Sequence, residues 1–232
     1  MVRTLLTRAY WQRIRLLGLC IGMVWFGSVA YGGVDFERLL ASVTQRWGAG
    51  VATKFSIWQS LILTNRSSAD ADRLKRVNDF FNRNIVFGDD ITVWAQEDYW
   101  ATPMETLGKG SGDCEDFVMA KYFTLKEMGV ESSKLRLIYV RAKTGSSEST
   151  ALTAHMVLAY YAKPDAEPMV LDNLIGDIRA ASRRPDLVPV FSFNSEGIFT
   201  GVSGKDAKPA AGTGRLSRWE DLLKRARTEG FE

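Results

Sequence analysis

The sequence is short of the side chains that carry most enzyme and metal chemistry. Among its 232 residues it has one histidine, His155, and two cysteines, Cys20 and Cys114. Cys20 lies in an apolar segment near the N-terminus, so removal of that segment would leave Cys114 alone and exclude an intramolecular disulfide. One cysteine and one histidine also match no compact zinc pattern, in which such ligands come in closely spaced pairs. Chemistry that needs a thiol or an imidazole must therefore use Cys114 or His155.

The sequence also lacks an internal repeat and a true excess of positive charge. Its formal net charge is +3, but residues 1–30 contain four arginines and no acidic residue. The rest of the chain keeps 26 of the 30 basic residues and all 27 acidic residues. Such a neutral body does not favour DNA or RNA binding. The composition, 46% hydrophobic and 25% charged, is that of a globular protein. We expect no nucleic-acid partner.

Residues 1–30 have the features of a targeting segment. A basic region ends at Arg15, and the fifteen residues that follow carry no charge. They end in Ser28–Ala30, which has the small-x-small form of a signal-peptidase site. Fifteen residues are fewer than the roughly 20 that span a bilayer, although counting on to Val34 brings the run close to that length. We therefore expect export, with residues 1–30 as a signal peptide or an N-terminal membrane anchor and residues 31–232 as a single domain.

Apolar spacing predicts helices first and strands later. Apolar residues recur every three or four positions in five segments that we expect to be helices: residues 35–47, 51–63, 69–85, 114–128 and a C-terminal segment from Ser217. Alternating patterns predict four strands: residues 135–142, 154–161, 169–172 and about 188–193. Ser217 and Glu220 have the spacing of a capping box. This order, with a hairpin between the second and third strands, predicts an α+β fold rather than a doubly wound sheet.

Two segments show no clear period. Residues 87–110 contain several aromatic side chains, among them Trp94, Tyr99 and Trp100, without helical or strand spacing. We interpret this segment as irregular structure that either forms a wall of a cleft or covers the core. Residues 143–153 are rich in serine and predict a mobile loop before the second strand.

Cys114 occupies a position suited to a nucleophile. It follows Gly110–Asp113 and stands at or next to the first residue of the helix predicted over 114–128. The free N–H groups and the partial positive charge at a helix N-terminus favour a thiolate over a thiol. The backbone N–H of Cys114 is also placed to donate to a developing oxyanion. The alternative is a buried, inert cysteine.

His155 and Asp172 are expected to face each other. His155 begins the second predicted strand, and Asp172 ends the partner strand of the same hairpin. Opposed residues on neighbouring strands have β-carbons about 5 Å apart, so a carboxylate there can hold an imidazole. With Cys114 they form a trio in which a thiolate attacks a carbonyl, an imidazole moves protons and a carboxylate orients the ring. The alternatives are a structural histidine and a strand-end turn at Asp172.

Three acidic residues surround the cysteine, namely Asp113, Glu115 and Asp116. They can cap the helix and complement its dipole, but their negative charge opposes thiolate formation. A bound cation would resolve this conflict, and hard oxygen ligands favour Ca²⁺ over zinc. We therefore predict that these acids, with one of Asp89 and Asp90, bind calcium beside Cys114.

Four motifs together resemble a known family. They are Asp98-Tyr-Trp-Ala-Thr-Pro-Met-Glu105, Gly110-Ser-Gly-Asp-Cys-Glu-Asp-Phe117, Ala154-His-Met-Val-Leu158 and Val170-Leu-Asp-Asn173. In these motifs the chain is similar to the bacterial transglutaminase-like cysteine proteinases, over about residues 35 to 200. The resemblance implies a papain-like, transglutaminase-core α+β fold, with Cys114 as nucleophile, His155 as base and Asp172 as orienting acid.

The resemblance also implies a setting for the enzyme. Such proteases are periplasmic and need calcium held by acids beside the cysteine, positions that Asp113 and Glu115 match here. Their substrate is a large surface adhesin, cut near its N-terminus, and the cut releases the adhesin and disperses the biofilm. An inner-membrane receptor for cyclic di-GMP sequesters the protease. Two other functions stay open, namely acyl transfer to an amine, as in a true transglutaminase, and a non-catalytic domain that binds a receptor or a wall component.

Overall fold

Three helices open the described part of the chain, in the order that the apolar spacing predicts. A computed structural model describes residues 34–143, 151–199 and 216–231. The first helices are α2 (Phe36–Trp47), α3 (Val51–Asn65) and α4 (Asp70–Asn84). The Asp35 side chain caps α2 by accepting a hydrogen bond from the backbone N–H of Arg38. Their apolar faces meet in the main core, which confirms the three predicted helices.

Two predictions concern residues outside the described ranges. The first is the export segment, residues 1–30. The second is the loop predicted over residues 143–153, of which residues 144–150 lie outside the described ranges. Among the described residues, none of the helices has both the length and the apolar character needed to cross a membrane.

The segment predicted to be irregular, residues 87–110, in fact contains two short helices. These are α5 (Asp90–Trp94) and α6 (Pro103–Lys109), and the segment also joins two short parallel strands, β1 (Val86–Phe87) and β2 (Ser111–Gly112). The start of α6 is a capping box in which Thr102 and Glu105 satisfy each other's backbone N–H groups, with Pro103 as the first helical residue. These residues are a local helix signal, so the prediction of irregular structure was wrong for α6 in particular.

Helix α7 (Cys114–Glu127) is the most deeply buried helix of the described residues. It begins at Cys114 as predicted, and Gly129 follows it with a positive φ of 86°. Apolar residues on one stripe predict one buried face, yet every residue from Asp116 to Leu125 is buried. Helix α4, helix α6 and the sheet all pack against α7. The polar side chains Asp116 and Lys121 are therefore buried together with the apolar ones.

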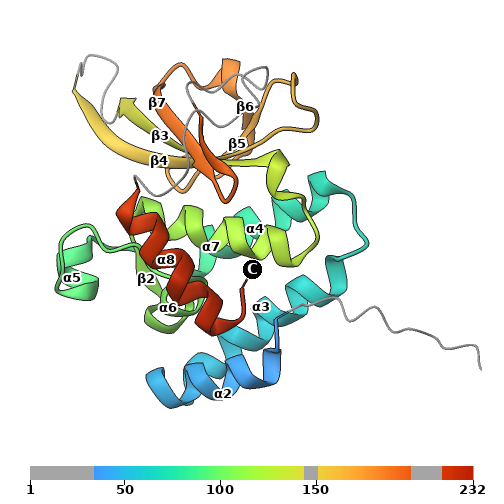
Figure 1. Cartoon of the computed structure of the whole chain (residues 1–232), viewed down its shortest axis with the longest axis vertical. Helices are drawn as coiled ribbons and strands as arrows, with labels where there is room; N and C mark the ends of the chain where they lie inside the picture. Colours follow the sequence, from blue (N-terminus) through green and yellow to red (C-terminus); the bar gives the residue numbers. More distant parts are fainter. Residues whose placement is uncertain (1–33, 144–150, 200–215, 232) are drawn as a thin grey trace, which may run out of the picture. The chain divides into compact units, whose positions relative to one another are not determined.

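The strands form a six-stranded antiparallel sheet in the order β6-β5-β4-β3-β7-β8. Their bounds are β3 (Leu135–Lys143), β4 (Leu152–Tyr160), β5 (Met169–Leu171), β6 (Arg179–Ala180), β7 (Leu187–Asn194) and β8 (Gly197–Phe199). Two 3-10 turns, η1 (Ser132–Lys134) and η2 (Ala181–Arg183), precede β3 and follow β6. One face of the sheet lies on the helices, with α7 beneath β4 (Figure 1). The four predicted strands and the hairpin of β4 and β5 are confirmed.

A last helix, α8 (Ser217–Glu229), packs onto the same core. The residues predicted to face inward are buried, namely Trp219, Leu222, Leu223 and Ala226. The predicted capping box is wrong, because Leu216 is the N-cap residue and Ser217 is already helical. A serine inside the first turn cannot accept from that turn's N–H groups in the way an N-cap does. The whole arrangement of helices and antiparallel sheet confirms the predicted α+β class.

Candidate active site

His155 and Asp172 are hydrogen-bonded in the folded chain. The Nε2 atom of His155 on β4 lies 2.8 Å from Oδ1 of Asp172, which directly follows β5. Both side chains are buried, with 5% and 0% of their surface exposed. The hydrogen bond to Asp172 places the proton on Nε2 and leaves Nδ1 as the basic nitrogen. The hairpin therefore positions an imidazole in the tautomer that a general base needs.

The Asp172 carboxylate is held from three sides. Its Oδ1 atom also accepts the backbone N–H of Leu174 at 3.0 Å, and its Oδ2 atom accepts Nη2 of Arg184 at 2.6 Å. Burial alone would raise the pKa of Asp172, but the hydrogen bond and charge of His155, with the contacts from Leu174 and Arg184, lower that pKa to about 2. Asp172 is thus ionised throughout the neutral range and keeps the ring of His155 in place.

The Cys114 thiol lies at the N-terminus of α7 against strand β4. The sulfur lies close enough to the backbone of Met156, the residue that follows His155, for that backbone to lower the pKa of the thiol. The thiol donates in turn to Oε2 of Glu115 at 2.6 Å. Burial, and then the negative charge of Glu115, raise the pKa of Cys114 far above its ordinary value. The helix N-terminus was expected to favour a thiolate, but burial and the adjacent carboxylates outweigh it in this state.

The acids around the cysteine form two groups that share Asp113. One oxygen each of Asp113 and Glu115 lies within 4.8 Å of the Cys114 sulfur and of each other, and single oxygens of Asp90, Asp113 and Asp116 lie within the same limit. Asp113 caps α7, as its position predicts, by accepting the N–H of Glu115 at 3.2 Å. Of the pair Asp89 and Asp90, only Asp90 reaches the cluster, because Asp89 caps α5.

The carboxylate cluster has the donor set of a hard divalent cation. Burial and the neighbouring carboxylates raise the pKa of Asp113 to about 9. Burial is also the largest cause that raises the pKa of Asp116 to about 7 and that of Asp90 to about 6. In addition, Oδ1 of Asp90 is buried and has no hydrogen-bond partner among the described residues. A cation bound by oxygen ligands would relieve this crowding of carboxyl groups and would satisfy the unpaired oxygen.

Comparison with known proteins decides the family. The family model of the bacterial transglutaminase-like cysteine proteinase BTLCP matches residues 58–185, which is more than half of the chain. The chain belongs to this family. The matched range contains every residue of the cluster and of the Cys114, His155 and Asp172 arrangement. Membership of this cysteine proteinase family supports peptidase activity.

Solved structures of a family member agree with this. Legionella pneumophila LapG is 36% identical, with a TM-score of 0.69, over 83% of this chain and 98% of that chain. An EGTA-treated and a calcium-bound structure of the same protein are also 36% identical, with TM-scores of 0.70 and 0.69. No match is found among curated proteins. The likeness confirms the predicted family and the predicted transglutaminase-like cysteine protease fold.

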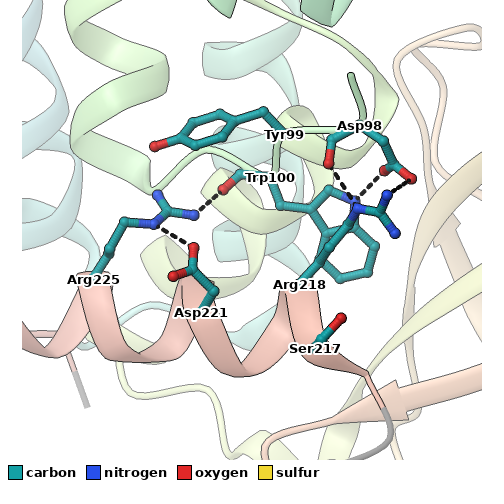
Figure 2. Close-up of a pocket in the computed structure, with 7 residues that line it drawn as sticks. All are labelled: Asp98, Tyr99, Trp100, Ser217, Arg218, Asp221 and Arg225. Atoms are coloured by element: carbon teal, nitrogen blue, oxygen red, sulfur yellow. Dashed lines mark hydrogen bonds and ion pairs between the residues drawn. The ribbon is translucent and has the colours of Figure 1, made fainter. Parts of the chain in front are cut away.

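The segment before α6 links this proteinase's acid cluster to its C-terminal helix. The backbone N–H of Tyr99 donates to Asp90 at 2.6 Å, and that of Ala101 donates to Asp116 at 2.7 Å. Figure 2 shows two arginines that reach from α8 to the same segment. Arg218 donates to the Asp98 carbonyl at 2.8 Å and Arg225 to the Trp100 carbonyl at 2.6 Å, around a pocket of about 270 Å³. Helix α8 therefore braces the backbone that holds two of the acids.

Arg184 is a charged residue of the site that the sequence alone does not indicate. Arg184 follows η2, and only 1% of its side chain is exposed. Besides Asp172, its Nη2 contacts Asp186 Oδ2 at 2.8 Å. No local pattern marks this residue, because Arg183 next to it is also an arginine and lies at the surface side of the same turn. Only the fold shows which of the two arginines reaches Asp172.

Proposed function

We propose that this chain is a cysteine endopeptidase in which Cys114 is the nucleophile, His155 the base and Asp172 the orienting acid. The observation that supports this most directly is the buried hydrogen bond between His155 on β4 and Asp172. Cys114 begins α7, the helix that packs against β4. Family membership supports the reaction class, and we propose the roles within it from the positions of the three residues.

The proposed reaction proceeds in two halves. Nδ1 of His155 takes the thiol proton, and the sulfur of Cys114 attacks the carbonyl carbon of the scissile peptide bond. The same proton passes to the leaving amine, which departs and leaves a thioester on Cys114. A water molecule then gives a proton to His155 and attacks the thioester, which releases the acid product and restores the thiol. Asp172 keeps the ring oriented and balances the charge of the imidazolium in both halves.

We further propose that Asp113, Glu115 and Asp116, together with Asp90, hold Ca²⁺ beside Cys114. Support comes from the crowded, partly unsatisfied carboxylates and from the calcium-bound structure of the similar LapG. When bound, calcium supplies positive charge that offsets these carboxylates next to the thiol. Glu115 accepts the thiol hydrogen at 2.6 Å, and a calcium ion bound to Glu115 would leave that proton to His155.

The biological setting that we propose follows the family. The protease acts in the periplasm on the N-terminal region of a large surface adhesin, which releases the adhesin and disperses the biofilm. An inner-membrane receptor for cyclic di-GMP sequesters the protease when the messenger is abundant. The apolar N-terminal segment of this sequence supports export. The substrate and the receptor are assigned by family analogy.

The direct test is to incubate the purified chain with the N-terminal portion of a large surface adhesin encoded by the same organism. We expect one cut in calcium and no cut in EGTA, read by gel electrophoresis and intact mass. Adding a primary amine separates the alternatives, since a transglutaminase would give the amine adduct instead of the acid product. A chain that binds the receptor domain but cuts nothing in calcium would be the non-catalytic domain of the same fold.

Calcium is expected to raise the melting temperature by more at pH 8 than at pH 5. Without a cation, the folded chain holds protons on Asp113 and Asp116, whose pKa values are raised to about 9 and about 7. The unfolded chain releases those protons above about pH 4. The stability of the calcium-free protein therefore falls as pH rises from about 4 to about 9. Calcium needs ionised ligands, so its stabilising effect grows over the same range.

Thermal melts in CaCl₂ and in EGTA at the two pH values measure this difference. Asp113→Asn is expected to reduce the calcium shift strongly, and Asp89→Asn, on the acid that caps α5 instead, is the matched control that keeps it. An equal shift at both pH values, or an unchanged shift in Asp113→Asn, would place calcium elsewhere.

A further inference from the structure

Lys121 is a buried lysine on the same helix as the cysteine. It lies seven residues after Cys114 on α7, two helical turns along the same side. None of its surface is exposed. Its ammonium nitrogen donates to Oδ1 of Asn78 at 2.8 Å and to the backbone carbonyl of Asp172 at 3.2 Å. One helix therefore carries Cys114 at its start and, two turns later, a contact to the main chain of Asp172.

Packing alone does not explain a lysine at this position. Burial lowers the pKa of Lys121 to about 7, although the charge of Asp172 opposes that change. Both hydrogen-bond acceptors of its ammonium group are neutral oxygens. An unbranched apolar side chain such as methionine would fill the same space without burying an amine. The lysine supplies a hydrogen-bond donor to Asn78 and Asp172, and its ammonium nitrogen also lies 5.7 Å from the centroid of the Phe117 ring.

The same carbonyl is held from a second helix. Asn82 on α4 donates to the carbonyl of Asp172 at 2.8 Å, and Asn78, one turn earlier, donates to the carbonyl of Gly176 at 2.7 Å. Lys121 connects these two hydrogen bonds, because it donates both to Asn78 and to the carbonyl of Asp172. The main chain that leaves β5 is thus clamped between α4 and α7, directly behind the carboxylate that holds His155.

We propose that Lys121 is a positioning residue that sets the place of Asp172, and through it the ring of His155, relative to Cys114. The inference rests on the proposed function, in which these three residues react together. Cys114 and Lys121 lie on the same continuous helix, so the hydrogen bond of Lys121 ties the main chain of Asp172 to the helix that presents the thiol. Misplacement of a reacting group by about 1 Å can cost on the order of a hundredfold in rate.

The test compares Lys121→Met with Lys75→Met, a matched control at a lysine that is 69% exposed on α4. Lys121→Met is expected to lower kcat by about 10- to 100-fold and to change KM by less than about threefold. Lys121→Arg, which keeps the donors, is expected to recover part of kcat. All variants are assayed in calcium at a temperature where circular dichroism shows them folded, and Lys75→Met is expected to match wild type.

A double-mutant cycle with Asp172→Asn asks whether Lys121 acts through Asp172. In that background Lys121→Met is expected to cost less than about threefold, because the residue it positions has already lost its function. An equal loss in both backgrounds would overturn the proposal, and so would a kcat of Lys121→Met within twofold of wild type.

A readout that needs no catalysis separates this inference from the proposed function. His155 is the only histidine of the 232-residue sequence, so ¹⁵N-histidine labelling gives a single imidazole signal in the untagged protein. Lys121→Met is expected to shift the Nε2–H resonance of the His155–Asp172 hydrogen bond, and Lys75→Met to leave it in place. A wild-type protein without peptidase activity would overturn the proposed function alone. An unchanged resonance in Lys121→Met would overturn the positioning role.

Discussion

Replacing Cys114 with alanine is expected to abolish cleavage and to leave the fold intact. Loss of the nucleophile in a triad of this type lowers kcat by more than about ten-thousandfold. The cost to stability is expected to be small, because the side chain is only partly buried and its thiol hydrogen goes to Glu115 instead of to a core partner. Cleavage of the adhesin fragment and a thermal melt measure the two quantities.

Cys114→Ser is the matched control for this variant. It keeps a hydrogen donor to Glu115 but presents a much weaker nucleophile beside His155. We expect the serine variant to be folded and at least a thousandfold slower than wild type. Cleavage by Cys114→Ala at more than about one per cent of the wild-type rate would show that another group performs the attack.

Arg184→Met is expected to cause the largest loss of stability among single substitutions near the site. It would leave the buried carboxylate of Asp172 without its 2.6 Å ion pair, and removing one partner of a buried pair costs about 3–5 kcal/mol. For a chain of this size, that corresponds to a fall in melting temperature of roughly 6–20 °C. The rate is expected to fall too, since Asp172 would no longer be held against His155.

The other acid that Arg184 contacts provides the control. Asp186 is 29% exposed, so water can replace its contact, and Asp186→Asn is expected to cost no more than about 1 kcal/mol. The difference in unfolding free energy between wild type and Arg184→Met should also become smaller as the pH falls from 4 to 2. Because the pKa of Asp172 is lowered to about 2 in the fold, its contribution to stability is present above pH 4 and is lost as it becomes protonated. Equal stability of wild type and Arg184→Met at pH 7 would contradict this account.

Much of the secondary structure was predictable because its signals are local. Helical spacing located α2, α3, α4, α7 and α8, and alternation located β3, β4, β5 and β7. The errors were local too. The segment predicted to be irregular contains α6, whose start is the capping box of Thr102 and Glu105. The capping box predicted at Ser217 does not form, because Ser217 is already inside α8. Both errors arose where short-range capping decides the structure without a long apolar period.

Some residues of the candidate site were also predictable from the sequence, and others were not. Cys114 and His155 were predicted as site residues because they are rare residue types at the ends of predicted elements. Asp172 was predicted because it ends the partner strand of the hairpin, and the structure brings His155 and Asp172 within 2.8 Å. Asp90 was predicted only as one of the pair Asp89 and Asp90, because α5 was not predicted. The start of α5 decides which acid is buried, since Asp89 caps the helix and Asp90 is its first residue. Arg184 and Lys121 look like ordinary surface charges in the sequence, yet both are buried.

By itself the sequence determined the family, the helix that presents the thiol and the hairpin that pairs the imidazole with a carboxylate. The helix follows from apolar residues three or four positions apart, and the hairpin follows from two strand patterns that are adjacent in the chain. Only the tertiary structure decided which charges meet away from solvent. Asp116 meets the N–H of Ala101 15 residues away, and Lys121 meets the carbonyl of Asp172 51 residues away. These contacts form only when the helices and the sheet pack together, because burial and hydrogen bonding depend on which groups are close in space.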